Sequence, residues 1–388
     1  MKVKIEKFDH LGNGIAKNED KIVFVKKALP NEIIDVSIKK EKKHYNVGTI
    51  NEIIEPSKNR IKSICPYYDK CGGCNFLHAH YDVEKDFKIN KGHELISNNL
   101  SFCDTKEYNY RNKVVFHIKD NKIGFYQQGS NKIVDIDYCY LLDDRINKVL
   151  KTIKLYLKDN SITKIMVRVG NDIMLDIVGN VNKELITNLN FVDTIVLNDK
   201  VIKGKGYVEK KLFNYKFKIS PKSFFQVNYD GLTCIYNILK KELIKEYNYA
   251  LDLYSGTSVM GILISEFCKK VISVECNSDA TNDALINIKN NDIDNIEVIN
   301  DKVENIIDNL CNVDLIIVDP PRSGLDVKTI NYIKSILPDT LVYISCDMIT
   351  LKRDLEVLKD TFNINNTYLI NMFSKTYHVE NLCILTKK

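Results

Sequence analysis

A cysteine and a glutamate near the C-terminus are the residues of this chain best suited to covalent chemistry. Cys346 follows the apolar run Leu341–Ile344, and Glu380 is the only acidic residue in the apolar segment Val379–Leu385. A thiolate is a nucleophile and a carboxylate can accept a proton, so the pair suits a reaction that needs a nucleophile first and a base afterwards. A lone cysteine at a strand end is more often a small buried hydrophobic residue, and only the nearby acid favours the chemical role.

A second group of cysteines has spacing typical of a metal centre. Cys65, Cys71 and Cys74 lie close together, with two glycines between the last two, and Cys139 is available as a fourth thiolate. Four thiolates bind an iron–sulfur cluster or a zinc ion equally well, so the spacing leaves both open. The chain has 11 cysteines, an odd number that argues against a disulfide framework. The other cysteines show no pairing and are expected to be structural: 103, 234, 268, 276, 311 and 383.

Acidic residues after predicted strands favour a nucleoside cofactor. A turn containing Gly256 follows the predicted strand Ala250–Leu253, and Glu275 ends the next strand, where a carboxylate can accept hydrogen bonds from ribose hydroxyls. Asp319 begins the sequence Asp-Pro-Pro-Arg, whose prolines fix a rigid turn. No glycine-rich loop with a lysine for a triphosphate is present in the sequence.

Four of these candidates share one place in the predicted fold, because each lies at or just after the end of a short apolar strand: Gly256, Glu275, Asp319 and Cys346. From about residue 224 onward, buried strands alternate with helical spacers, which predicts a doubly wound parallel sheet. Ligands bind such sheets at the carboxyl ends of the strands. We therefore expect an α/β domain over residues 220–388 with its site at that edge. The predicted strands are Ala250–Leu253, Val271–Glu275, Ile296–Ile299, Leu315–Val318 and Leu341–Ile344.

Two further domains are expected before the α/β domain. Residues 1–55 alternate β-branched runs with Gly, Asn and Pro, the pattern of a small β-barrel. Residues 56–219 contain the cysteine group, a helix over 81–98 and then strands with polar turns, which predict a β-rich module. The predicted strands are Lys21–Val25, Ile33–Ile38 and Val47–Ile54 in the barrel, and Lys113–Ile118, Lys122–Tyr126, Lys164–Val169 and Met174–Val178 in the module.

Length and charge set broad limits on the class of protein. A chain of 388 residues predicts two or three domains, because single cores stop growing at roughly 250 to 300 residues. The net charge is +5, and the excess lies in residues 1–62, with 14 Lys/Arg against 9 Asp/Glu. That excess suits phosphate binding, although a solvated lysine-rich surface explains it at least as well. No apolar run approaches the ~20 residues of a membrane span, and no signal peptide is visible, so we expect a cytoplasmic protein. We also expect a monomer.

Together these motifs resemble the bacterial RNA uridine-5-methyltransferase family over nearly the whole chain. Residues 1–55 resemble its TRAM domain, an RNA-binding β-barrel of OB-like form, and Tyr110–Lys113 and Ile123–Tyr126 resemble its central module. Ser223–Asn228 resembles the element whose glutamine contacts S-adenosylmethionine. The resemblance therefore implies a Rossmann-like methyltransferase domain behind two RNA-binding modules.

The resemblance also implies a role for each candidate residue. Cys346 would be the nucleophile and Glu380 the proton acceptor in methylation of carbon 5 of a uridine. RNA would be the partner, with 23S ribosomal RNA favoured over transfer RNA. The contacts to S-adenosylmethionine would be Gln226, Tyr254, Glu275 and Asp319, and the ligands of a [4Fe-4S] cluster would be Cys65, Cys71, Cys74 and Cys139.

Three departures from the family pattern leave other functions open. This chain has Ser258 where the family commonly has a second glycine, Asp347-Met348 where it has Asn-Pro, and Ser374 where it often has proline. A degenerate enzyme that only binds or chaperones RNA is one alternative. Independently of these departures, Asp319-Pro-Pro-Arg322 is also similar to a motif of methyltransferases that act on an adenine amino group, which is a second alternative. The amino-group reaction needs no cysteine, so it would leave Cys346 and Glu380 without a role.

Overall fold

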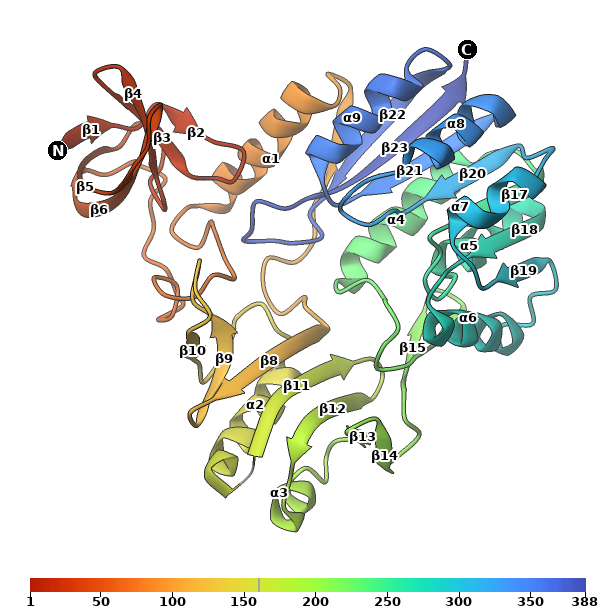
Figure 1. The fold of residues 1–388 in the computed structure, drawn as a ribbon, viewed down its shortest axis with the longest axis horizontal. Helices are drawn as coiled ribbons and strands as arrows, with labels where there is room; N and C mark the ends of the chain where they lie inside the picture. Colours follow the sequence, from red (N-terminus) through yellow and green to blue (C-terminus); the bar gives the residue numbers. More distant parts are fainter. Residues whose placement is uncertain (160) are drawn as a thin grey trace.

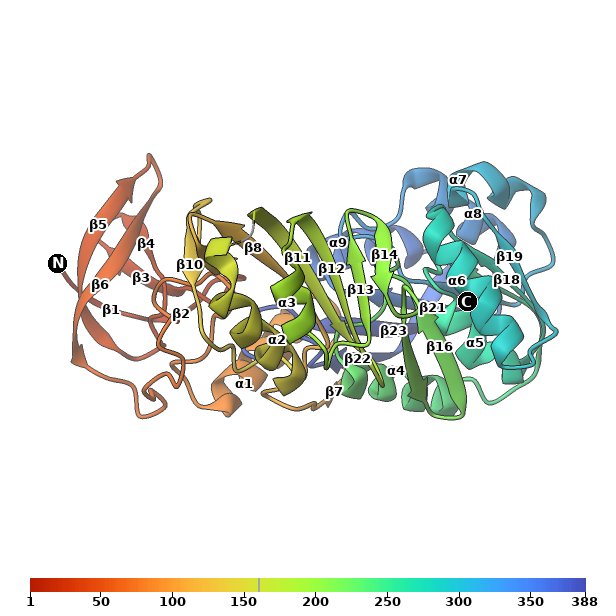
Figure 2. The same cartoon turned by 90° about the horizontal axis from the view of Figure 1, so that it is seen from below.

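The structure is a computed structural model that describes residues 1–159 and 161–388. Three large β-sheets succeed one another along the chain. The N-terminal sheet lies at one end of the molecule, the C-terminal α/β sheet lies at the other, and the central sheet lies between them and to one side (Figures 1 and 2). Within the described residues, no helix is both long and apolar enough to cross a membrane.

The N-terminal sheet confirms the predicted β-barrel strands. Apolar β-branched residues alternate with polar ones, so that Val23, Val25, Ile34 and Val36 are buried in a common core. The strand order is β1-β5-β6-β4-β3-β2, and only β4 and β6 pair in parallel. The strands are β1 (Lys2–Lys4), β2 (Lys7–Phe8), β3 (Gly14–Asn18), β4 (Lys21–Val25), β5 (Ile33–Glu41) and β6 (Tyr45–Glu55).

The central sheet has the order β10-β9-β8-β11-β12-β13-β14. Its strands are β8 (Lys113–Lys119), β9 (Lys122–Tyr126), β10 (Ile133–Asp135), β11 (Ser161–Val169), β12 (Ile173–Asn180), β13 (Thr194–Leu197) and β14 (Lys200–Lys203). It is accompanied by α2 (Asp144–Leu155), η1 (Leu157–Asp159) and α3 (Lys183–Asn188), and is followed by the hairpin β15 (Val208–Leu212) and β16 (Tyr215–Ile219). All four predicted strands of this module are confirmed.

The C-terminal sheet has the order β19-β18-β17-β20-β21-β23-β22-β7. The first five strands are parallel, as predicted, whereas β23 is antiparallel to both of its neighbours. The strands are β17 (Tyr247–Leu253), β18 (Cys268–Val274), β19 (Ile296–Ile299), β20 (Leu315–Val318), β21 (Thr340–Ser345), β22 (Phe362–Ile370), β23 (Glu380–Lys387) and β7 (Leu100–Cys103).

Four of the longer helices beside this sheet begin at a side chain that accepts backbone N–H groups of the first turn. Such caps satisfy donors that have no partner inside the helix. The capped helices are α4 (Tyr229–Glu242) at Asn228, α6 (Ser278–Asn290) at Asn277, α8 (Val327–Ile336) at Asp326 and α9 (Met348–Leu358) at Asp347. The shorter helices are α5 (Val259–Ile264), η2 (Ser265–Phe267), α7 (Val303–Ile306) and η3 (Ile307–Asn309).

A segment from before the central sheet completes the C-terminal sheet. The predicted helix over 81–98 is α1 (Tyr81–Leu95), which contacts α9, β7 and β22. The strand after it, β7, pairs in parallel with β22 and forms the edge of the sheet. From the sequence, this segment is expected in the central module. The domain boundaries at residues 55 and 219 stay predictions.

One cysteine pairing corrects an expectation from the sequence. Cys103 and Cys234, expected to be unpaired, form a disulfide with Cα atoms 6.5 Å apart. They lie 131 residues apart in the sequence and meet because β7 joins the sheet beside α4. The nine other cysteines of the described chain are free thiols.

Candidate active site

The candidate site begins where the strand order of the C-terminal sheet reverses. β17 and β20 are neighbours, with Leu253 paired to Val318 at their carboxyl ends. Asp252 lies at the end of β17, and Asp319 follows β20 directly. Such a reversal leaves a crevice outside the strands, which is where open α/β sheets bind ligands.

Three of the four predicted cofactor residues line one pocket in this crevice. Gln226, Tyr254 and Asp319 share its wall with Phe224 and with Asp252. The side-chain amide of Gln226 donates a hydrogen bond of 3.4 Å to Asp319. We call this the cofactor pocket.

The fourth predicted cofactor residue, Glu275, is fastened to the turn that forms the pocket. One carboxylate oxygen of Glu275 accepts the backbone N–H of Gly256 at 2.9 Å, and the other accepts that of Asn277 at 2.7 Å. Tyr254, Gly256 and Ser258 all have positive φ values, of 62°, 55° and 56°. Left-handed backbone is costly for residues other than glycine and clusters at ligand sites.

Cys346 and Glu380 are brought together by the pairing of β21 with β23. In this antiparallel ladder Ser345 pairs with Asn381, so that the residues just beyond them, Cys346 and Glu380, are neighbours. Asn381 also donates a side-chain hydrogen bond to the carbonyl of Ser345 at 2.9 Å. Cys346 immediately precedes Asp347, the cap of α9, so its sulfur lies at a helix N-terminus, where the dipole favours a negative charge.

The charges around this pair are mostly acidic. Burial, followed by the charge of Glu380, raises the pKa of the Cys346 thiol to about 11. Burial and then Asp319 raise the pKa of Glu380 well above its ordinary range. Burial raises the pKa of Asp319 itself to about 7. The Cys346 thiol therefore favours its neutral form in the free protein, and the two carboxyl groups are shifted toward theirs.

Two groups at this site were missed by the sequence analysis. Arg322 contacts Cys346 and opposes the rise in pKa of both Cys346 and Glu380. It belongs to the same Asp-Pro-Pro-Arg segment as Asp319, so the motif contained the signal. Asp252 is buried, with one carboxylate oxygen unpartnered and the other accepting the N–H of Gly261 at 2.8 Å. Burial raises the pKa of Asp252 to about 7.

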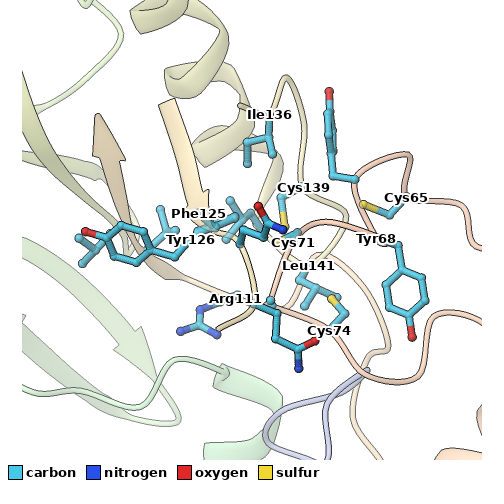
Figure 3. Close-up of a pocket in the computed structure, with 18 of the residues that line it drawn as sticks. Cys65, Tyr68, Cys71, Cys74, Arg111, Phe125, Tyr126, Ile136, Cys139 and Leu141 are labelled. Carbon is cyan, nitrogen blue, oxygen red and sulfur yellow. The ribbon is translucent and has the colours of Figure 1, made fainter. Parts of the chain in front are cut away.

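The four predicted metal ligands line a second pocket, of ≈ 920 Å³, which we call the cysteine pocket. Cys65, Cys71, Cys74 and Cys139 lie around one space, with Arg111 on the side away from Cys65 (Figure 3). Burial raises the pKa of all four thiols, and for Cys74 the charges of the other three act in the same direction.

The four thiols of the cysteine pocket are not close enough together to coordinate a single metal ion. In the part of the chain that the structure describes, no group of three or more His, Cys, Asp or Glu side chains is arranged to hold a metal ion. Phe224, which is 58% exposed, lines both this pocket and the cofactor pocket. The two pockets are therefore adjacent.

Comparison with known proteins identifies the family. A sequence profile described as tRNA (Uracil-5-)-methyltransferase matches residues 179–314 and 301–388, and the TRAM domain profile matches residues 1–50. An RNA methyltransferase from Clostridium acetobutylicum is 32% identical over 99% of this chain and 96% of its own length. One from Aquifex aeolicus is 31% identical over 100% of this chain and 99% of its own.

A solved structure shares the whole architecture. The tRNA (uracil-54, C5)-methyltransferase of Pyrococcus abyssi, in complex with S-adenosyl-L-homocysteine, matches with a TM-score of 0.83 and 23% identity. The match covers 100% of this chain and 99% of that one, which confirms the α/β fold of an S-adenosylmethionine-dependent methyltransferase. With its TRAM domain and its catalytic-domain match, this chain belongs to the RNA uracil-5-methyltransferase family.

Proposed function

We propose that the protein methylates carbon 5 of a specific uridine in RNA, with Cys346 as the nucleophile and Glu380 as the base. The observation that carries this proposal is the adjacency of Cys346 and Glu380 across β21 and β23. Asp319, on the wall of the cofactor pocket, is near enough to raise the pKa of Glu380. A thiol, a carboxyl group and a pocket at the ends of the parallel strands thus lie at one edge of the sheet, which supports the proposal.

The proposed reaction uses each group once. The thiolate of Cys346 adds to carbon 6 of the uracil, which makes carbon 5 electron-rich enough to take the methyl group from S-adenosylmethionine. The carboxylate of Glu380 then removes the proton from carbon 5. The electrons of that C–H bond re-form the double bond between carbons 5 and 6, and the Cys346 thiolate leaves. Removal of the base from its stack is required, and the exposed ring of Phe224 offers a stacking surface.

The acidic surroundings suit a positively charged methyl donor. Asp252, Asp319 and Glu380 all have raised pKa values, and Arg322 is the cation that opposes the shift of Glu380. The sulfonium of S-adenosylmethionine is a cation, and a cation in this pocket favours the ionised carboxylates. Gln226, Tyr254, Glu275 and Asp319 are the residues that we propose hold it.

Ribosomal RNA of the large subunit is the substrate that we propose, and transfer RNA is the alternative. The 23S proposal rests on the family resemblance of the TRAM domain and of the cysteine group before the catalytic domain. The alternative is favoured by the P. abyssi tRNA methyltransferase, which matches the whole chain. Either RNA is available in the cytoplasm, where we propose that the protein acts.

We further propose that the cysteine pocket holds a [4Fe-4S] cluster. Four thiols from Cys65, Cys71, Cys74 and Cys139 line one space, which is the donor set of such a cluster. A cluster is larger than a single ion, so its ligands need not converge as closely as the four thiols of a zinc site. Its positive irons would favour the thiolate forms that burial disfavours. The proposed reaction transfers no electron, so the cluster would stabilise the fold.

The function is tested by mapping 5-methyluridine in total RNA. Cells without the protein should lack the modified base at one site in 23S ribosomal RNA, and the wild-type gene should restore it. A gene carrying Cys346→Ala should not restore 5-methyluridine, because no covalent adduct at carbon 6 of the uracil can form. Loss of the base from transfer RNA instead would select the alternative substrate, and unchanged 5-methyluridine with altered N6-methyladenosine would refute the function.

The role of Glu380 has a distinct signature. Glu380→Gln should still allow Cys346 to add and the methyl group to transfer, but the proton on carbon 5 would remain. Methyl-labelled RNA should therefore accumulate as a covalent complex with the protein on a denaturing gel. The double variant with Cys346→Ala is the control and should show no complex. Normal turnover by Glu380→Gln would rule out this residue as the base.

The rate of methyl transfer should depend on pH through Cys346. The pKa of its thiol is about 11 in the free protein, so the thiolate fraction rises about tenfold per pH unit at neutral pH. Single-turnover transfer to RNA from cells lacking the protein should therefore accelerate about a hundredfold over the two pH units between pH 6.5 and 8.5. Arg322→Ala should be slower at each pH, because the pKa of the thiol then rises further. A flat profile would mean that ionisation of this thiol does not limit the step.

The metal content of anaerobically purified protein decides between cluster and zinc. We expect about four irons and four sulfides per chain, with the visible absorption of an iron–sulfur cluster. Cys74→Ser should lose both iron and absorption, whereas Cys276→Ser, at an exposed free cysteine, should keep them. One zinc per chain without iron would contradict the proposal.

A further inference from the structure

The nine-residue loop that leads to Glu380 is held by a buried pair of charges on α1. This loop, residues 371–379, connects β22 to β23, and Glu380 is the first residue of β23. It projects beneath α1 (Figure 1), where Glu84 and Lys88 lie one turn apart, both 0% exposed. Lys88 donates a hydrogen bond of 2.5 Å to Glu84.

Every second residue in the first half of the loop is bonded to this pair. Lys88 donates to the side-chain oxygen of Asn371 at 2.6 Å and to the carbonyl of Phe373 at 3.3 Å. Glu84 accepts the backbone N–H of Lys375 at 2.8 Å. The loop contains no helix or strand whose regular hydrogen bonds could pair its polar groups. Hydrogen bonds from Glu84 and Lys88 of α1 pair three of these groups instead.

Lys375 continues the network in the other direction. Its backbone has a φ of 65° and its side chain is 2% exposed, with the ammonium group paired to Glu107. The second oxygen of Glu84 is 4.0 Å from the same ammonium group. Two acidic and two basic side chains thus form a neutral cluster directly before the proposed base.

The opposite side of the loop is held by the cysteine segment. The backbone N–H groups of Asn75 and Phe76 donate to the carbonyl of Lys375 at 2.8 and 3.2 Å. Tyr110 donates its hydroxyl to the carbonyl of Ser374 at 2.9 Å. Asn75 directly follows Cys74, so the wall of the cysteine pocket and the loop before Glu380 are joined by hydrogen bonds.

Such a cluster is a poor device for stability alone. Burial of two charges is costly, and replacing a buried ion pair by apolar groups of similar size is often neutral or stabilising. The second carboxylate oxygen of Glu84 is buried without a hydrogen-bond partner in the described part of the chain, so the cluster is not optimised for stability. Its remaining hydrogen bonds do, however, favour one conformation of the segments that they join. The loop held by this network leads directly to Glu380, whose position decides whether the proton on carbon 5 can be removed.

We propose that the Glu84–Lys88 pair positions Glu380, by holding the 371–379 loop so that the carboxylate stays beside Cys346 while the adduct is resolved. The two residues touch neither substrate nor cofactor in this scheme and act only through the loop. The proposal rests on the proposed function, because it needs Glu380 to take the proton from carbon 5 as the C–S bond breaks.

The test is the double variant Glu84→Gln/Lys88→Met, which removes both charges and leaves the cluster neutral. Methyl transfer from labelled S-adenosylmethionine to total RNA from cells lacking the protein should stay within about twofold of wild type. Release of the methylated RNA should slow at least tenfold, so that the covalent complex accumulates as it does for Glu380→Gln. Its melting temperature should stay close to that of the wild type, because no lone charge is left buried.

A control uses a pair of charges on α4 that bonds to β22 and not to the loop itself. Lys241 and Glu242 on α4 bond to Tyr368 in β22. Lys241→Met/Glu242→Gln should release RNA as fast as the wild type. Tyr110→Phe, which removes only the hydroxyl bonded to Ser374, should slow release about threefold in a protein that folds normally.

The outcomes separate the two proposals. If Glu380→Gln forms no stalled complex, the base assignment itself fails. If Glu380→Gln stalls while the double variant and Tyr110→Phe release RNA normally, only the positioning role is overturned. Equal slowing of methyl transfer and release in the double variant would also overturn it, because a merely structural pair weakens every step alike.

Discussion

The antiparallel pairing of β21 with β23 is the constraint on which the candidate site depends. In a purely parallel sheet, the first residue of the last strand would lie at the edge where the other strands begin, far from the end of β21. Because β23 runs the other way, its first residue lies beside the last residue of β21, and Ser345 pairs with Asn381 although they are 36 residues apart. Glu380 therefore reaches the edge of the sheet at which the parallel strands end and at which Cys346 precedes the cap of α9.

The electrostatics of that edge follow from the same arrangement. Parallel strands converge on one crevice, so Asp252 and Asp319, at the ends of β17 and β20, lie near Glu380 from β23. Burial is the main cause of the raised pKa values of Asp252 and Glu380, and the charge of Asp319 raises both pKa values further. Arg322, on the turn after Asp319, is the opposing charge. A site of this kind is incomplete without a cationic ligand, and S-adenosylmethionine is one.

Much of this architecture is visible in the sequence because it depends on local patterns. The predicted strand Ile296–Ile299 coincides with β19, and the continuous apolar run Leu315–Val318 coincides with β20. By contrast, β22 contains three asparagines in its nine residues and was not predicted, because its stability comes from pairing with β23 and β7. The same holds for β7 and for the Cys103–Cys234 disulfide, which depend on contacts between distant segments. Local periodicity carries no information about such pairings.

The departures from the family pattern can now be judged by what the substituted residues do. Ser258 adopts the left-handed conformation that favours glycine, and its hydroxyl bonds to that of Ser273 at 2.7 Å, which offsets part of the strain. Asp347 accepts two backbone N–H groups at the start of α9, the role that asparagine also fills at a helix cap. Ser374 is buried, and its carbonyl is held by Tyr110. Nothing in the structure explains Met348 or the hydroxyl of Ser374, which is buried without a hydrogen-bond partner among the described residues. Ser258 and Asp347, however, keep the local backbone in the form that the site needs, and this argues for a working enzyme rather than a degenerate one.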